Sequence, residues 1–205
     1  MAGNDVARID KVVTSGTFSL DGETFDVDNN VWVVGDDHQV IVIDAAHDAG
    51  AIVTAVGDRQ VVALVLTHAH DDHISAAGAV QSATGAPAWL HPDDRMLWDA
   101  LYPAPPQHDL VHGTTLTVGN IELMALHTPG HSPGSSCLYA PSLGAVFSGD
   151  TLFDGGPGAT GRSYSDRPTI EASVRERLFS LPPDTVVHTG HGTDTTIAVE
   201  SARSW

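Results

Sequence analysis

Short apolar runs rich in β-branched residues alternate along the chain with turns that contain glycine, proline or aspartate. Residues 31–34 and 40–43 are two such runs, and the polar turn 35–38 between them predicts a β-hairpin. Residues 61–66 are apolar throughout, which is typical of a strand buried on both faces. The same pattern predicts further strands at 14–18, 20–27, 116–118, 121–126, 135–139, 145–148 and 186–188.

Helical segments fall between and after these strands. Residues 74–84 are rich in small residues, and Gly85 is placed to end a helix there. Pro92 and Pro168 each stand where a helix begins, and residues 195–203 predict a last helix. Strands, a helix, more strands and more helices together indicate an α/β or α+β fold of sheets covered by helices. The length of 205 residues fits a single domain over 1–205.

The charge balance narrows the possible partners. The formal net charge is −17, which opposes a general nucleic-acid or anionic-membrane binder because both need a basic surface.

The longest clean apolar run, 61–66, falls far short of the roughly 20 residues that cross a bilayer. The first residues lack the basic start and apolar run of a secretory signal, so we expect a cytoplasmic protein. Cys137 is the single cysteine, and we expect it to pack in the interior as a free thiol, without a redox or metal-binding role.

Possible metal ligands are most concentrated directly after the buried strand, in the run Thr67-His68-Ala69-His70-Asp71-Asp72-His73. His68 and His70 are two residues apart, so their side chains point the same way in an extended segment. A turn into the following helix then brings Asp72 and His73 toward the same space. Neutral imidazole and carboxylate groups are good ligands for Zn²⁺, so this run predicts a metal site.

Three later strand ends each carry one more candidate ligand. His131 lies in the loop Thr128-Pro129-Gly130-His131, Asp150 follows Ser148-Gly149, and His191 stands between two glycines. Each residue alone is a weak signal. Sites in layered sheet folds assemble at strand ends, so the three together support one shared site.

These motifs resemble those of the metallo-β-lactamase-fold hydrolases. The run from His68 to His73 matches the H-x-H-x-D-H signature of that family, and His131, Asp150 and His191 match its later ligands in order. Asp44 resembles the early strand-end aspartate of the family. The resemblance covers roughly residues 31–191 and implies a four-layer αββα sandwich with metals at one edge.

The resemblance also implies how the ligands are shared between two divalent metal ions, Zn²⁺ first, with Fe or Mn as alternatives. The first ion is expected on His68, His70 and His131. The second is expected on Asp72, His73 and His191, with Asp150 bridging both. Two such ions lower the pKa of a bridging water, so that a hydroxide held at Asp150 becomes available at neutral pH. Asp72 is expected to orient this hydroxide as well as to bind metal.

Within the family, the likeness is strongest to short glyoxalase II-like thioester hydrolases. Residues 149–153 match their G-D-T-L-F segment, and Gly161-Arg162 with Asp166 resembles G-R-x-D, although three residues separate Arg162 from Asp166. Only 14 residues follow His191, so we expect no C-terminal glutathione-binding helical domain. The resemblance implies a small-molecule acyl-thiol substrate, with mycothiol or glutathione as the thiol. Either Arg162 and Tyr164 hold its acidic or polar tail, or Arg162 pairs with Asp166 or caps a neighbouring carbonyl.

Three other functions remain open. A persulfide dioxygenase of the same fold would hold one iron on His68, His131 and Asp150, a set that suits oxygen chemistry. A lactone or β-lactam hydrolase would use the same ligand pattern. A non-enzymatic metal-binding module is disfavoured, because the sequence keeps every ligand of the signature.

Overall fold

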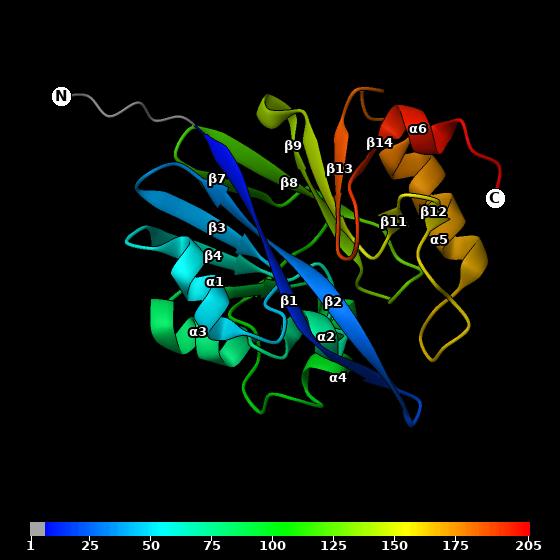
Figure 1. Cartoon of the computed structure of the whole chain (residues 1–205). Helices are drawn as coiled ribbons and strands as arrows, with labels where there is room; N and C mark the ends of the chain where they lie inside the picture. Colours follow the sequence, from blue (N-terminus) through cyan, green and yellow to red (C-terminus); the bar gives the residue numbers. More distant parts are fainter. Residues whose placement is uncertain (1–6) are drawn as a thin grey trace.

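Two six-stranded sheets form the centre of the computed structural model, which describes residues 7–205 (Figure 1). The first sheet has the order β1-β2-β3-β4-β5-β6, and the second has the order β14-β13-β10-β9-β8-β7. The strands of the first sheet are β1 (Arg8–Leu20), β2 (Glu23–Gly35), β3 (Gln39–Ile43), β4 (Gln60–Val65), β5 (Ala88–Leu90) and β6 (His108–Asp109). Those of the second are β7 (Thr115–Val118), β8 (Ile121–His127), β9 (Ser136–Ala140), β10 (Ala145–Gly149), β13 (Val186–Thr189) and β14 (Thr195–Thr196). The short strands β11 (Leu152–Phe153) and β12 (Gly156–Pro157) pair separately.

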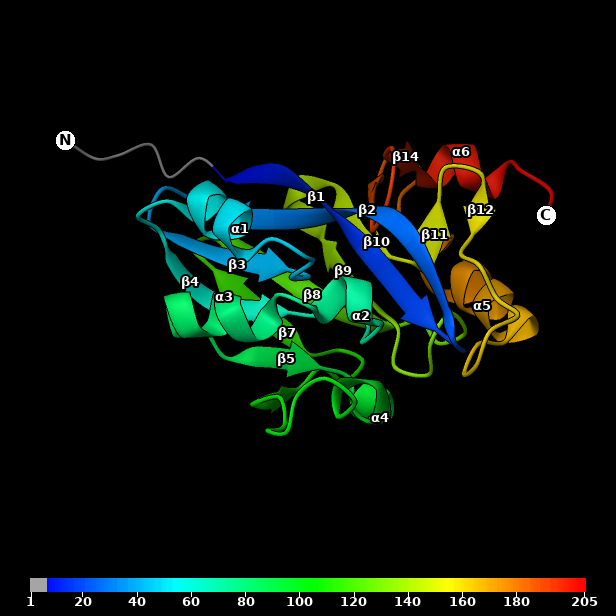
Figure 2. The ribbon, with the colours of Figure 1, turned by 60° about the horizontal axis from the view of Figure 1, so that its bottom comes forward.

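Helices cover the outer faces of the two sheets (Figure 2). On the first sheet lie α1 (Ala49–Val56), α2 (Asp71–Ile74), α3 (Ala77–Thr84), the 3₁₀ turn η1 (Pro92–Asp94) and α4 (Arg95–Trp98). The second sheet carries α5 (Arg167–Ser173), the π-helical turn η3 (Val174–Leu178) and α6 (Ile197–Ser201), with the turn η2 (Pro141–Leu143) between β9 and β10. The predicted αββα sandwich is therefore confirmed. Among the described residues, no helix is both long and apolar enough to cross a membrane.

The alternation of side chains along each strand fills three apolar layers. On β2, Val31 and Val33 pack toward the helices of the first sheet, whereas Trp32 and Val34 face the second sheet. Residues from both sheets meet in that middle layer, where Phe147 is fully buried. A third layer joins the second sheet to η3 and α6. Burial on both faces explains why the central strands are apolar throughout.

The first two strands form one long hairpin, and the predicted boundary at residue 20 is wrong. The ladder pairs Arg8 with Gly35 at one end and Leu20 with Glu23 at the other. Asp21 and Gly22 make the turn with φ of 55° and 78°, as the Asp-Gly pair of a tight hairpin requires. In Figure 1 the turn extends beyond the other strands of the sheet.

Most remaining predicted elements are present with shifted ends. The predicted 74–84 helix is broken after Ile74, because the amide of Ala76 donates to the carbonyl of Ala45 at 2.9 Å. Gly85 does end α3, in the left-handed conformation that suits glycine. The last predicted helix starts two residues late, since Thr195–Thr196 pairs with β13 as β14. Residues 108–109, for which the sequence pattern predicted no strand, form β6.

Candidate metal centre

The seven candidate ligands come together where the ends of the two sheets meet. His68, His70, Asp72 and His73 follow β4 and run into α2, so a buried strand fixes where the segment begins. His131 follows β8, Asp150 follows β10, and His191 follows β13. The structure therefore brings all seven predicted residues to one place, from four strand ends.

Three imidazoles form the first cluster. Nδ1 of His70 lies 3.1 Å from Nε2 of His68 and 3.0 Å from Nε2 of His131. All three side chains are buried. Neutral imidazole nitrogens this close present lone pairs to a common point, where a single cation can accept all three.

The second cluster combines two imidazoles and a carboxylate. Nε2 of His73 lies 3.2 Å from Nε2 of His191, and Oδ2 of Asp72 lies 3.3 Å from that same His191 nitrogen. His73 is completely buried and Asp72 nearly so. This donor set is that of an ordinary divalent-metal site.

Asp150 stands between the two clusters. Its Oδ1 lies 3.2 Å from Nε2 of His73, and its Oδ2 lies 3.5 Å from Nε2 of His131 and 3.3 Å from Nε2 of His191. Oδ1 is buried without a hydrogen-bond partner among the described residues. A buried, unpartnered carboxylate oxygen is costly unless a cation neutralises it, so the chain's donors fit a pair of metal ions.

The outward nitrogens of four of these imidazoles are also held, which fixes how each ring is turned. Their partners are Oγ1 of Thr67 for His68 at 3.1 Å, Oδ2 of Asp44 for His73 at 2.9 Å, the carbonyl of Ala159 for His131 at 2.9 Å, and the carbonyl of Asp28 for His191 at 2.7 Å. Asp44 also accepts from the amide and the hydroxyl of Thr67 at 2.8 and 2.9 Å. Asp44 therefore holds His73 of the second cluster directly and His68 of the first cluster through Thr67.

Sequence reasoning missed Asn29, which is fully buried. Its Nδ2 donates to Oδ2 of Asp72 at 3.0 Å, and its Oδ1 accepts from Nε2 of His47 at 2.8 Å. Asn29 thereby fixes the carboxylate of Asp72. The sequence carries little signal for it, because Asn29 lies in a polar stretch between the two strands predicted at 20–27 and 31–34, and only the continuous strand β2 places it in the interior.

The histidine pKa values shift in opposite directions in the two clusters, downward for His70 and upward for His191. Burial and the neighbouring His131 lower the pKa of His70 to about 3, so its imidazole is neutral and ready to bind metal. In the second cluster burial opposes a charge on His191, but Asp150 and Asp72 raise its pKa to about 10. The carboxylates that hold a proton there would hold a metal cation in the same way.

We expect the metal-free protein to lose stability with rising pH. His191 has a folded-state pKa of about 10 against an ordinary value of 6.5, so its contribution is complete below 6.5 and is lost as the pH rises through 10. Urea unfolding of chelator-treated protein between pH 6 and 9 measures this slope. The slope should be shallower in His191→Ala and in zinc-loaded protein, where metal replaces the proton. A slope that is the same in wild type and His191→Ala would contradict this assignment.

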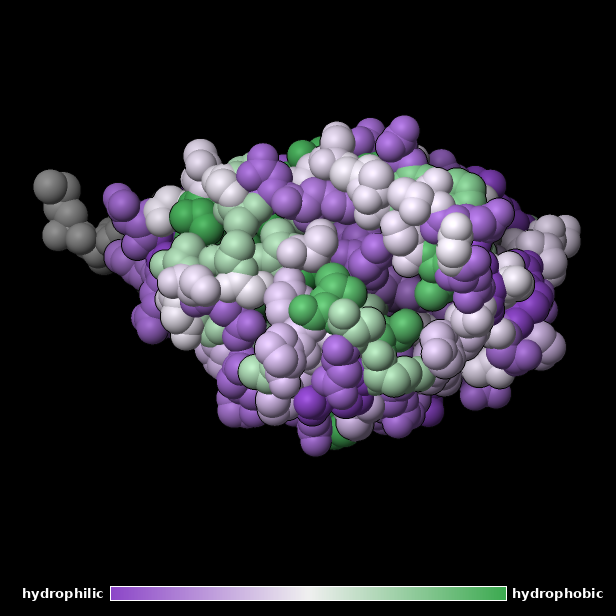
Figure 3. All heavy atoms as spheres, turned by 90° about the horizontal axis from the view of Figure 1, so that it is seen from below, coloured by the Kyte–Doolittle hydropathy of each residue, from purple (hydrophilic) through white to green (hydrophobic). Residues whose placement is uncertain are grey.

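A cavity of about 70 Å³ opens beside the first cluster, and its lining includes Phe18, His70, His131 and Arg162. Seen from below, the molecule has a hydrophilic recess with hydrophobic side chains along part of its rim (Figure 3). Tyr164 is 55% exposed and is not part of the cavity lining. Of the two predicted substrate residues, Arg162 alone therefore faces the cavity.

The partner of Arg162 is Glu23 of the long hairpin. Nη1 of Arg162 lies 2.8 Å from Oε2 of Glu23, and the guanidinium lies 4.7 Å from the ring centre of Phe25. The alternative that Arg162 pairs with Asp166 is wrong, because Asp166 caps α5 by accepting from the amide of Thr169 at 2.9 Å. The hairpin turn and the Arg162 loop thus meet at the cavity.

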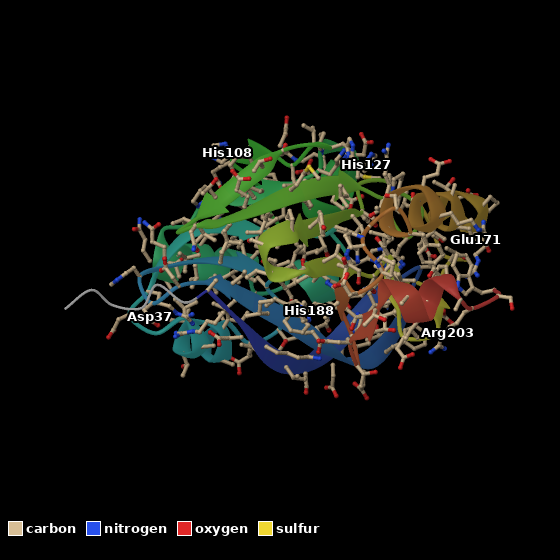
Figure 4. The ribbon with its side chains drawn as sticks, turned by 90° about the horizontal axis from the view of Figure 1, so that it is seen from above. Asp37, His108, His127, Glu171, His188 and Arg203 are labelled. Carbon is tan, nitrogen blue, oxygen red and sulfur yellow. The ribbon has the colours of Figure 1, made fainter. Side chains whose placement is uncertain are left out.

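A second group of possible ligands, His91, Asp93 and His127, is less suited to metal. The His91 and His127 rings stack with centres 3.9 Å apart and planes 10° apart, so their lone pairs run in parallel planes and do not converge. Nε2 of His127 donates to the carbonyl of Pro133 at 2.9 Å. His127 and His188 each precede a loop that carries a candidate ligand, and Figure 4 shows His127 near one edge of the molecule and His188 closer to its middle. His188 is bound instead to Asp194, at 2.7 Å.

Comparison with known sequences agrees with this geometry. The profile described as the metallo-beta-lactamase superfamily matches residues 24–191. The probable metallo-hydrolase YqgX of Bacillus subtilis is 33% identical over 83% of this chain and 88% of its own length. The hydroxyacylglutathione hydrolase GloC of Haemophilus influenzae is 29% identical over 83% of this chain and 87% of its own length.

Solved structures give the same result. The B3 metallo-beta-lactamase BLEG-1 superposes with a TM-score of 0.79 at 32% identity, over 93% of this chain and 97% of its own. TTHA1623, solved in a di-iron-bound form, superposes with a TM-score of 0.73 at 32% identity, over 93% and 98%. ETHE1 from Myxococcus xanthus gives 0.74 at 26% identity, over 93% and 82%. All three superpose on most of this chain, so the layered fold is shared.

Proposed function

Because this chain belongs to the metallo-beta-lactamase superfamily, we propose that it hydrolyses a thioester with two divalent metal ions, zinc in the first place. The observation that carries the proposal is Asp150, whose two oxygens reach both ligand clusters. The similarity to a hydroxyacylglutathione hydrolase over most of both chains supports the thioester as substrate. The coarser conclusion, a hydrolase of the metallo-beta-lactamase fold with a His/Asp centre for two metals, follows from family membership.

Two bound ions would supply a water of lowered pKa and polarise the substrate carbonyl. The chain itself orients that water. Burial raises the pKa of Asp72, but the charge of His73 and hydrogen bonds from His191 and Asn29 lower it overall, so Asp72 stays a carboxylate at neutral pH. Such a carboxylate accepts a hydrogen bond from the attacking water and turns its lone pair toward the carbonyl.

A thioester suits this arrangement. A thiol has an ordinary pKa of about 8.5, so the thiolate leaves near neutral pH without a strong general acid. The cavity beside the first cluster is lined by Phe18, Ala159 and Arg162, which offer apolar contact and one positive charge. We assign the acidic or polar tail of the thiol, in mycothiol or glutathione, to Arg162, with Tyr164 beside it on the same loop.

We expect Arg162→Ala to raise KM about fivefold for acyl-thiols that carry a carboxylate, with little change in kcat. The loss of one partly exposed charge pair is worth about 1 kcal/mol. Arg8→Ala is the matched control, since Arg8 is also partly exposed and pairs with Asp37 at the far end of the molecule (Figure 4). Equal KM changes for charged and uncharged acyl-thiols would contradict the role of Arg162.

Each of two alternative functions is supported by a specific observation. ETHE1 is a structural neighbour at 26% identity, and His131 lies 3.5 Å from Asp150, so one iron on His68, His131 and Asp150 remains a candidate for persulfide oxidation. BLEG-1 is described as a B3 metallo-beta-lactamase, which keeps hydrolysis of a β-lactam, or by extension a lactone, as a candidate.

Elemental analysis of protein purified without chelator or added metal is the first test. Nearly two equivalents of zinc, or of zinc and iron, together with release of thiol from acyl-glutathione or acyl-mycothiol, would support the proposal. One equivalent of iron with oxygen uptake on a persulfide would replace it with the dioxygenase. Turnover of a chromogenic cephalosporin or a lactone, with acyl-thiols inert, would replace the substrate class and leave the metal centre standing.

A further inference from the structure

We propose that Asp94 is a positioning residue for the first imidazole cluster, joining the loop of His68 and His70 to the loop of His131. The inference rests on the metal centre of the proposed function, and not on its substrate. Asp94 ends the turn η1 after β5 and is completely buried.

The carboxylate of Asp94 accepts hydrogen bonds from both loops. Oδ2 accepts from the amide of Ala69 at 3.0 Å and from the hydroxyl of Ser132 at 2.7 Å. Oδ1 accepts from the amide of Gly134 at 2.6 Å. Ala69 stands between two candidate ligands, and Ser132 directly follows the third. One side chain thus touches the backbone or side chain next to all three imidazoles.

These loops belong to different sheets, which gives the contact its importance. The loop of His68 follows β4 of the first sheet, whereas the loop of His131 follows β8 of the second. A backbone hydrogen bond from Ser136 to the carbonyl of Thr67, at 2.8 Å, joins them on the β9 side. Asp94 supplies the side-chain link, and the distances of 3.0–3.1 Å among the imidazole nitrogens depend on both loops keeping their places.

The packing around Asp94 is so close that the neighbouring position 134 accepts only glycine. A Cβ on Gly134 would lie 2.7 Å from Cγ of Asp94 and 2.9 Å from its backbone nitrogen, so only glycine lets the carboxylate approach. Ser132 is held in turn by Ser135, whose Oγ lies 2.8 Å from that of Ser132. All three donors point at oxygen atoms, so an amide in place of the carboxylate must turn an N–H toward at least one of them.

The test measures zinc affinity rather than activity, by competition with a chromophoric chelator. Asp94→Asn is placed in two backgrounds: His191→Ala, which leaves the first cluster complete, and His68→Ala, which leaves the second. We expect zinc affinity to fall about 10- to 100-fold in the His191→Ala background, the usual effect of losing a partner that orients ligands. In the His68→Ala background we expect a change of less than about threefold.

Asp36→Asn is the matched control. Asp36 is also largely buried and accepts two backbone amides, from His38 and Gln39 at 2.7 and 2.8 Å, in the β2–β3 turn away from the centre. It should lower the melting temperature without changing zinc affinity in either background. Ser132→Ala, which keeps the carboxylate, should weaken the same cluster by less, and it decides the matter should Asp94→Asn fail to fold.

Equal losses in both backgrounds, or no loss in either, would overturn the positioning role. Wild-type protein that binds no zinc would contradict both this inference and the proposed function. Protein that binds two zinc ions but leaves every acyl-thiol intact would contradict the substrate alone, and the Asp94 measurement would stand.

Discussion

Asp150→Ala should reduce kcat/KM for the best acyl-thiol substrate by about 10³-fold or more. The carboxylate lies within 3.5 Å of ligand nitrogens from both clusters, so its removal separates the two halves of the centre. Stabilisation of transition-state charge by paired metals is worth several kcal/mol, and about 4 kcal/mol corresponds to a thousandfold in rate. Stopped-flow detection of the released thiol measures the rate, and elemental analysis of the same sample should show fewer than two metals.

The control for this variant is Asp99→Ala, which removes an exposed carboxylate that pairs with Arg95. It should leave both rate and metal content unchanged. Burial raises the pKa of Asp150, but His73 and His191 lower it well below its ordinary value, so the native side chain is a carboxylate at neutral pH, whereas an asparagine amide carries no charge. Asp150→Asn should therefore be nearly as inactive as alanine. Activity within tenfold of wild type in either variant would remove Asp150 from the proposed mechanism.

The seven candidate ligands could be predicted because the chain encodes them locally. Four of the seven lie within six consecutive residues, and the other three each follow an apolar strand. The sandwich could be predicted for a similar reason, since each central strand is apolar on both faces. Motif and strand pattern are properties of neighbouring residues, and the fold only has to bring their ends together.

The residues that hold the ligands could not be found in this way. Asn29 and Asp72 are 43 positions apart, and Asp94 and Ser132 are 38 apart. Their pairing depends on how two sheets stack, which no local pattern specifies. Arg162 was recognised as a candidate, yet its partner Glu23 lies 139 positions away on a hairpin whose turn was placed wrongly. Asp166 is closer to Arg162 in sequence, but its carboxylate caps α5 and does not pair with Arg162.

The centre tolerates many charges in its interior because they are of opposite sign and lie close together. His73 is completely buried, yet Asp72, Asp150 and Asp44 surround it and raise its pKa well above the ordinary value against the effect of burial. Carboxylates and imidazoles that would each be costly alone offset one another, and a metal ion takes the place of the proton. The stability of the ligand shell and its readiness for metal thus have one electrostatic origin.

Asp44 is where this balance should be most sensitive to mutation. The side chain is 1% exposed and accepts three hydrogen bonds, two from Thr67 and one from Nδ1 of His73. Asp44→Ala leaves these donors unpaired in the interior and removes a counter-charge from His73. We expect the free energy of unfolding of the metal-free protein to fall by about 3–5 kcal/mol, as it does when one partner of a buried ion pair is removed. Urea unfolding with a fixed m-value measures the loss.

Asp44→Asn distinguishes the effect of losing the negative charge from the effect of the backbone conformation at residue 44. Asp44 has a φ of 63°, a left-handed conformation that asparagine adopts more readily than alanine. The amide also keeps one acceptor for Thr67, so the expected loss is smaller than for alanine and comes mainly from the contact with His73. Because His73 belongs to the second cluster, zinc affinity in the His68→Ala background should fall together with stability. A loss below about 1 kcal/mol in both variants would show that the charges of Asp72 and Asp150 suffice to hold His73 without Asp44.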